Sequence, residues 1–122
     1  MRLADDAWDV PSAAAGWTLR DCVAHLAETD DNATREIGAD APPAVAGERE
    51  GVLTAGQRHA RSLRPDEVLS WYREASDRLV AALRRHQGDD RLPWLGRPMS
   101  ARSFVSARLM EHWSHGLDIL EA

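Results

Sequence analysis

The sequence contains no lysine, a single cysteine and no long hydrophobic run. Cys22 alone cannot form an internal disulfide framework, so we expect a reducing, cytoplasmic compartment. Without a stretch of roughly 18 apolar residues there is no candidate transmembrane helix, and the N-terminus lacks the basic and then apolar pattern of a signal peptide. The net charge of −5, with arginines spread among acidic residues, disfavours a nucleic-acid surface. We therefore expect neither a membrane nor a nucleic acid as a partner.

What the sequence does contain is typical of one helical domain. The 122 residues are 43% apolar and 29% charged, which allows a single core and argues against disorder. No segment alternates apolar and polar residues with period two for long enough to predict a strand, and there are no internal repeats. The sequence therefore predicts one all-α domain over residues 1–122.

Two helical segments, one strong and one weak, are expected in the first half of the chain. Thr18 is a suitable N-cap, Asp21 lies three residues further on as in a capping box, and Gly38 would end the helix after an apolar stripe. The residues before this cap have little pattern and are typical of turns. Residues 48–63 predict a weaker helix, because two glycines lower its stability.

Two further strong helices are expected in the second half. Pro65, followed by acidic residues, is a favourable first helical residue, and Gly88 would end that helix. Residues 89–99 contain too many prolines for regular structure, and we expect Trp94 within them to cover one end of the bundle. Ser100 can cap a last helix that no proline interrupts. Three strong helices and a weak one predict an antiparallel helical bundle.

The last helix carries the residues of greatest chemical interest. At about 100° per residue, Glu111 and His115 lie one turn apart on the same face. Arg108 lies one turn before this pair and Asp118 one turn after it. A carboxylate and an imidazole at this spacing can bind one metal ion from a rigid helix. The other interpretation is an ordinary helical Glu/His pair, which on spacing alone is the commoner case.

The opposite side of the same helix is also apolar. Its large side chains are Leu109, Met110, Trp113, Leu117 and Leu120. A helix that is apolar on both sides is either central or covered by another element. Three strong helices are too few to bury both sides, so the sequence predicts a homodimer or a partner segment outside this chain.

Two stretches resemble a known family. The run GWTLRDCVAH at residues 16–25 resembles the signature G-W-S/T-x-x-D-x-x-x-H of the DinB/YfiT-like metalloenzyme superfamily, in its mycothiol-dependent maleylpyruvate isomerase branch. The segments WLG and PMS within residues 94–100, followed by ARLMEHWSHGLD at 107–118, are similar to the actinobacterial subgroup of that branch. The helices between these stretches occur in the same order as in the family.

The resemblance implies a four-helix bundle that holds a divalent metal ion, zinc in most members, with nickel as the other choice. Carried over by position, the ligands would be His25, Glu111 and His115. Three protein ligands leave one coordination position open, as a catalytic metal requires. In this family the open position would take water or the thiolate of a low-molecular-weight thiol such as mycothiol. The implied function is a thiol-dependent S-transferase or isomerase that acts on a small electrophile.

Four other side chains near these positions are weaker candidates. His112 lies one turn before His115 and gives a rival ligand set with His25. Arg108 would contact a substrate carboxylate or form an ion pair with an acidic neighbour. Asp118 would orient the ring of His115 by accepting a hydrogen bond from the ring nitrogen that does not bind the metal. Cys22 lies one turn before His25 and is a possible ligand, although a small buried thiol is its commoner role. None of these four roles follows from spacing alone.

The chain also departs from the family pattern. Family members have a helix before the G-W-T motif, and here most of that first helix is missing, so we expect the domain to be incomplete. The alternative function is a non-catalytic helical module that keeps the fold and acts through association or oligomerisation.

Overall fold

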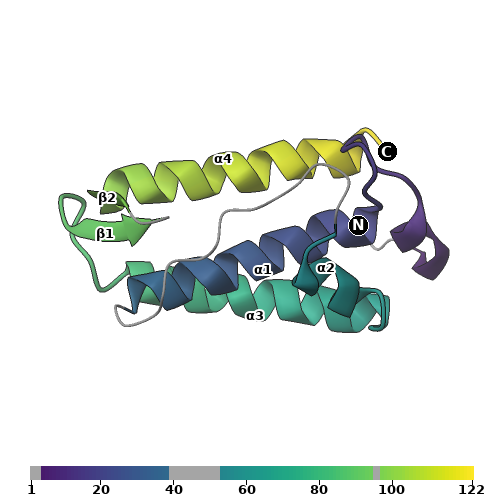
Figure 1. Cartoon of the computed structure of the whole chain (residues 1–122), viewed down its shortest axis with the longest axis horizontal. Helices are drawn as coiled ribbons and strands as arrows, with labels where there is room; N and C mark the ends of the chain where they lie inside the picture. Colours follow the sequence, from purple (N-terminus) through teal and green to yellow (C-terminus); the bar gives the residue numbers. More distant parts are fainter. Residues whose placement is uncertain (1–3, 39–52, 95–96) are drawn as a thin grey trace.

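The computed structural model describes residues 4–38, 53–94 and 97–122 of the chain (Figure 1). Apart from a short 3-10 helix and one two-stranded sheet, the regular structure in this part is α-helical, which confirms the all-α prediction. The elements in chain order are η1 (Asp5–Asp9), α1 (Leu19–Ile37), α2 (Ala55–Ala60), α3 (Pro65–Leu83), β1 (Arg91–Trp94), β2 (Arg97–Ser100) and α4 (Ala101–Leu120).

Helix α1 is the central element of the bundle. It lies between α3 and α4, and the short helix α2 packs against it (Figure 1). Helices α1 and α3 run in the same direction, and α4 runs antiparallel to both (Figure 1). The expected antiparallel packing therefore holds only for α4. Helices α1 and α3 are separated in the sequence by α2 and the residues around it, so no short loop forces them to run in opposite directions.

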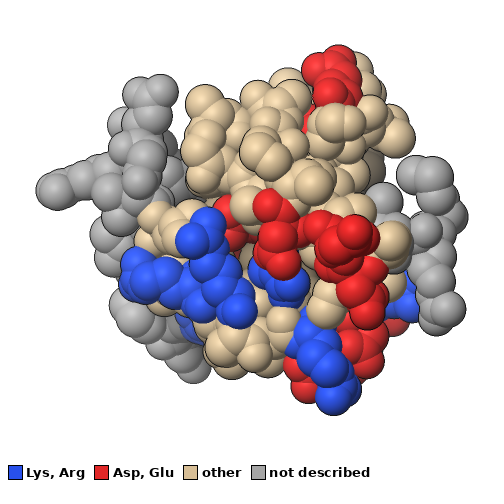
Figure 2. All heavy atoms as spheres, turned by 90° about the vertical axis from the view of Figure 1, so that its right-hand side faces the viewer, with Lys and Arg blue, Asp and Glu red and all other residues tan. Residues whose placement is uncertain are grey.

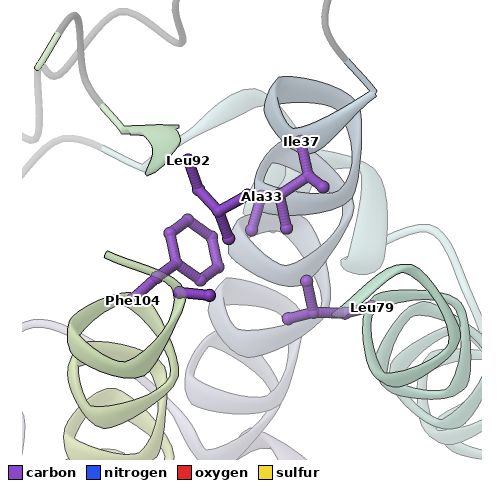
Figure 3. Close-up of a cluster of buried hydrophobic side chains, with 6 residues drawn as sticks. Ala33, Ile37, Leu79, Leu92 and Phe104 are labelled. Atoms are coloured by element: carbon purple, nitrogen blue, oxygen red, sulfur yellow. The ribbon is translucent and has the colours of Figure 1, made fainter. Parts of the chain in front are cut away.

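Two apolar clusters hold the bundle together. The first lies where α1 and α3 end and α4 begins, and Figure 3 shows Leu92 and Phe104 facing Ala33, Ile37 and Leu79. The second lies towards the start of α1 and consists of Trp8, Ala24, Ala60 and Val68. Trp8 comes from η1, a segment for which the sequence predicted only turns. Trp8 is 6% exposed, and the burial of this aromatic side chain explains why the segment is ordered as a 3-10 helix.

The three long helices begin where the sequence predicted. The Thr18 hydroxyl accepts from the backbone N–H of Asp21, whose carboxylate accepts from the backbone N–H of Thr18, so the predicted capping box is confirmed. Pro65 is the first residue of α3, and Ser100 caps α4. Helix α1 also ends as predicted, with Gly38 as its C-cap.

Two predicted boundaries were wrong. Helix α3 ends at Leu83 and not at Gly88, because the N–H groups of Arg85 and His86 bond to carbonyls three residues back and form a tighter turn. The weak helix predicted over 48–63 is confined to Ala55–Ala60 within the described residues, and the part of that prediction before residue 53 lies outside them.

The prediction that 89–99 is irregular was also wrong. Strands β1 and β2 form an antiparallel hairpin in which Pro93 is paired with Pro98. Proline is compatible with this arrangement because both strands are edges, so a missing N–H can face away from the ladder. Leu92 is 2% exposed and anchors the hairpin in the first apolar cluster. The side chain of Trp94, expected to cover one end of the bundle, lies outside the described ones.

Figure 2 shows the end of the bundle at which α1 begins and α4 ends. Acidic and basic side chains lie together over the lower part of this view, and the upper part, where α4 ends, is largely uncharged. Two ion pairs belong to this region: Arg20 with Asp9 at 2.8 Å and Arg61 with Asp21 at 3.0 Å. Among the described residues, no helix is both long enough and apolar enough to cross the membrane.

Candidate metal centre

Three side chains that are far apart in the sequence meet where α1 begins and α4 ends. They are His25 of α1 and Glu111 and His115 of α4, and their ligand atoms all lie within 4.8 Å of one another. The Glu111 carboxylate is 3.5 Å from His25 Nε2 and 3.4 Å from His115 Nε2. The two imidazole rings lie edge to face, with centroids 4.7 Å apart. The structure therefore brings together the three ligands that the family resemblance implied.

The cluster is closed on the histidine side and open on the carboxylate side. The side chains of His25 and His115 are 4% and 16% exposed, whereas that of Glu111 is 45% exposed. Each position follows from local structure. Glu111 and His115 are one turn apart on α4, and His25 is one turn after the capping residue Asp21 on α1. An ion or small molecule would thus approach past Glu111.

The Glu111 carboxylate lies between the two imidazoles and interacts with both. Hydrogen bonds from His115 and His25 hold the pKa of the Glu111 carboxyl well below its usual value. A hydrogen bond with Cys22, followed by the interaction with Glu111, raises the pKa of His115 to about 10. His115 therefore holds a proton over the neutral range, and a metal ion has to displace that proton in order to bind its nitrogen.

The donor set fits a divalent metal of the zinc or nickel type. Two imidazole nitrogens and one carboxylate oxygen are the ligands that such borderline ions prefer. Three protein ligands around one point, with the carboxylate side open to solvent, match the arrangement of a catalytic rather than a structural site.

Two neighbours hold the His115 ring from the sides. The Asp118 carboxylate lies 3.0 Å from His115 Nδ1, which leaves Nε2 facing Glu111. Trp17 lies nearly parallel to the His115 ring, at a centroid distance of 5.4 Å and an interplanar angle of 26°. Its centroid is also 4.9 Å from that of His25. Sequence reasoning assigned Trp17 no part in this centre, and its position directly before the capping Thr18 was the available signal.

Cys22 lies next to the centre. It is fully buried, and its thiol donates to the Ser12 hydroxyl at a sulfur–oxygen distance of 3.3 Å. The cluster of possible ligand atoms in the described part of the chain does not include it. This is the environment expected of a small buried thiol.

The structure brings His112 and Arg108 to a different cluster. His112 Nε2 is 3.0 Å from the Asp30 carboxylate, and Nδ1 of the same ring is 3.3 Å from the Tyr72 hydroxyl. Arg108 donates to Asp30 and to the Thr29 hydroxyl, both at 2.8 Å. Within the described residues, the ligand cluster with His25 therefore contains Glu111 and not His112.

The chain is similar to proteins of one family. The family model described as the mycothiol maleylpyruvate isomerase N-terminal domain matches residues 1–120. Two proteins of Mycobacterium tuberculosis, Rv0036c of strain H37Rv and MT0041 of strain CDC 1551, are each 37% identical to this chain over 122 residues. Each alignment covers 96% of this chain and 48% of the relative, so the chain spans about half the length of these relatives.

Two crystal structures share the fold. The mycothiol-dependent maleylpyruvate isomerase matches with a TM-score of 0.72 and 21% identity, covering 96% of this chain and 51% of that one. A mutant of that enzyme matches with a TM-score of 0.76 and 19% identity, covering 98% of this chain and 52% of that one. At this level of identity the likeness concerns the fold.

Proposed function

Since this chain belongs to the family of mycothiol maleylpyruvate isomerase N-terminal domains, we propose that it holds a divalent metal ion through His25, Glu111 and His115 and acts in a thiol-dependent isomerase or S-transferase reaction. The observation that supports this most is the meeting of three suitable ligand atoms within 4.8 Å. We propose zinc as the ion, with nickel as the second choice, and residues 1–122 as a single domain. A cytoplasmic location is part of the proposal.

Each side chain of the centre has a role in this proposal. When bound, the ion would lower the pKa of a thiol at its open position, so that a nucleophilic thiolate exists at neutral pH. His25 and His115 would supply neutral nitrogen ligands, and Glu111 would supply the negative charge that offsets part of the charge of the ion. Asp118 would keep the proton on Nδ1 of His115 and so direct Nε2 towards the ion.

The proposed partners are a low-molecular-weight thiol, mycothiol by family, and a small electrophile. A thiolate that adds to a carbon–carbon double bond conjugated with a carbonyl forms a carbon–sulfur bond, and the π electrons of the double bond move onto the carbonyl as an enolate. Taking up a proton from solvent then gives the S-conjugate, whereas rotation about the former double bond and expulsion of the thiolate restores the double bond and gives isomerisation. The half-exposed Glu111 side of the centre is the route by which both partners would enter.

A second candidate function is an association module without catalysis. The observation in its favour is the outer face of α4, where large apolar side chains stay exposed: Leu109 64%, Met110 67%, Trp113 68%, Leu117 37% and Leu120 72%. A contiguous exposed apolar surface marks an interaction site. We propose that a second copy of the chain covers it, and this is compatible with either function because the face points away from the metal centre.

Thiol coordination separates the two functions without requiring turnover. The untagged chain is loaded with cobalt(II) as a spectroscopic substitute for zinc and titrated with mycothiol. We expect a new thiolate-to-cobalt charge-transfer band in the near ultraviolet, because the open position accepts the sulfur. The S-methylated thiol, which cannot form a thiolate, should give no band.

Two variants complete this experiment. His25→Ala should lose the band, and His59→Ala, which removes an exposed imidazole on α2, should keep it. A chain that binds cobalt but whose spectrum does not respond to the thiol would contradict the catalytic proposal and favour the association module.

A further inference from the structure

A second polar cluster lies inside the bundle beside the metal centre. At its middle is Asp30 of α1, whose side chain has no exposed surface. One carboxylate oxygen accepts from Arg108 at 2.8 Å, both oxygens are 3.0 Å from His112 Nε2, and Ser76 donates to the second oxygen at 3.3 Å. Asp30 therefore joins all three long helices. We call Asp30, Arg108 and His112 the Asp30 clamp.

The clamp flanks the ligands on α4. Arg108 precedes Glu111 by three residues and His112 follows it directly, so two bonds to one fixed carboxylate determine both the rotation and the axial position of this turn. A slip of one residue along a helix moves a side chain by about 1.5 Å and turns it by about 100°. Metal–ligand distances tolerate only about 0.2 Å, so the register of α4 decides whether the ion is held.

The clamp also reaches the turn of α1 that carries His25. Thr29 Oγ1 accepts from Arg108 at 2.8 Å and donates to the backbone carbonyl of His25, also at 2.8 Å. One guanidinium of α4 is thus connected through a single hydroxyl to the residue that supplies the α1 ligand. Both ligand-bearing turns are fixed by the same group of side chains.

Apolar packing does not fix this part of α4. The buried residues of α4 are Ala101, Phe104 and Arg108. Ala101 and Phe104 belong to the apolar cluster at the start of the helix, two turns before Glu111. Arg108 is the one buried residue of α4 beyond this cluster in the described part of the chain, so the clamp is the buried link between α4 and the turn of α1 that carries Asp30. Further along α4, the stacking of Trp17 on His115 and the backbone hydrogen bond from Ala13 to Asp118 add to it.

We propose that Asp30 is a positioning residue for the metal centre, holding α4 in the register at which Glu111 and His115 meet His25. This inference rests on the proposed function, because it concerns the affinity and geometry of the proposed ion. Replacing a carboxylate behind a metal site reduces metal affinity by about 10-fold to 100-fold in other proteins. We expect an effect of this size, because the clamp fixes the turns of α1 and α4 that carry the ligands.

The test compares cobalt(II) binding to the wild-type chain, Asp30→Asn and Val68→Ala. Asparagine keeps the shape of Asp30 but removes its charge, and Val68→Ala reduces stability in the other apolar cluster without touching α4. For Asp30→Asn we expect a dissociation constant raised at least about 10-fold and altered visible d–d bands, with the helical content retained. For Val68→Ala we expect wild-type affinity and wild-type bands.

His112→Gln gives a second measurement should Asp30→Asn fail to fold. Glutamine can donate to Asp30, so we expect weaker cobalt binding than in the wild type but a folded chain. The inference is overturned if Asp30→Asn binds cobalt with wild-type affinity and spectrum, or if Val68→Ala is affected equally. Failure of the proposed function is distinguishable, because the wild-type chain then binds no cobalt or binds it without a spectral response to the thiol.

Discussion

At the scale of single residues, Asp30 is a buried carboxylate that stays ionised. Burial on its own raises the pKa of this carboxyl, but the hydrogen bonds and charges of His112 and Arg108 outweigh that effect and hold the pKa below its usual value of 3.8. A carboxyl whose pKa is lower in the folded state than in the unfolded state stabilises the fold above its unfolded pKa. That contribution is lost as the pH falls through the folded pKa.

The stability of the chain should therefore depend on Asp30 in a pH-dependent way. Near pH 7 we expect Asp30→Asn to lower the free energy of unfolding by about 3 kcal/mol, because it leaves Arg108 as a buried charge without its partner. As the pH falls below the unfolded-state pKa of Asp30, the difference between the two chains should shrink, because the unfolded wild type takes up a proton there first. The difference should vanish once the pH falls below the lower folded-state pKa, where Asp30 loses its charge in the folded wild type as well. Urea unfolding followed by tryptophan fluorescence measures both values.

Val68→Ala serves as the control for this measurement, because it removes only apolar contacts and its cost should not change with pH. An Asp30→Asn difference that is equally large at acidic and neutral pH would contradict the account of the clamp.

The sequence predicted the site only in part, and residue by residue the reason is clear. Glu111 and His115 share a helix turn, so their spacing alone identified them as a possible pair. His25 lies on the flank of an apolar stripe, and only the family resemblance identified it as a third ligand. Trp17 and Asp30 lie at the site because of their contacts with side chains of α4. No local pattern predicts such contacts, because they depend on the register of α1 against α4.

At the scale of the elements, α4 has two distinct faces. The inner face carries two residues of the clamp and the proposed ligands Glu111 and His115, and the outer face is apolar and exposed. Four of the exposed residues follow one another at intervals of three, four and three, which is the spacing of a coiled-coil seam: Met110, Trp113, Leu117 and Leu120. Small uncharged residues, Ser114 and Gly116, flank this seam and would allow close approach.

We therefore predict that the 122-residue chain forms dimers through the outer face of α4. Burying this face on a second copy removes apolar area from water at about 25 cal/mol per Å². The double variant Trp113→Ser, Leu117→Ser should be monomeric in analytical ultracentrifugation and keep its helical content, since both side chains are exposed. A wild-type chain that sediments as a monomer at tens of micromolar would show this prediction to be wrong.

Element boundaries were predictable where a side chain determines them. Thr18, Pro65 and Ser100 mark the starts of α1, α3 and α4 through capping or a fixed backbone angle. The hairpin could not be predicted, because its two strands are only four residues long and contain facing prolines. What stabilises it is the burial of Leu92 under Phe104 and Ile37, a contact that exists only in the assembled bundle.

At the scale of the whole molecule, different parts of the three long helices hold the bundle together and carry the candidate site. One end is held by the apolar cluster around Phe104, the middle by the Asp30 clamp, and the other end carries His25, Glu111 and His115. Because α4 runs antiparallel to α1, residues near the start of one helix meet residues near the end of the other. This antiparallel pairing brings the three proposed ligands together.

The metal content of the purified chain tests the central claim most directly. The untagged protein is incubated with zinc or nickel, freed of excess ion and analysed for metal per chain by mass spectrometry. We predict about one tightly held ion per chain in the wild type and in His59→Ala, and none in His25→Ala or Glu111→Ala, because three ligands are needed to hold a catalytic ion. A wild-type chain without metal, or full metal content in both ligand variants, would contradict the account.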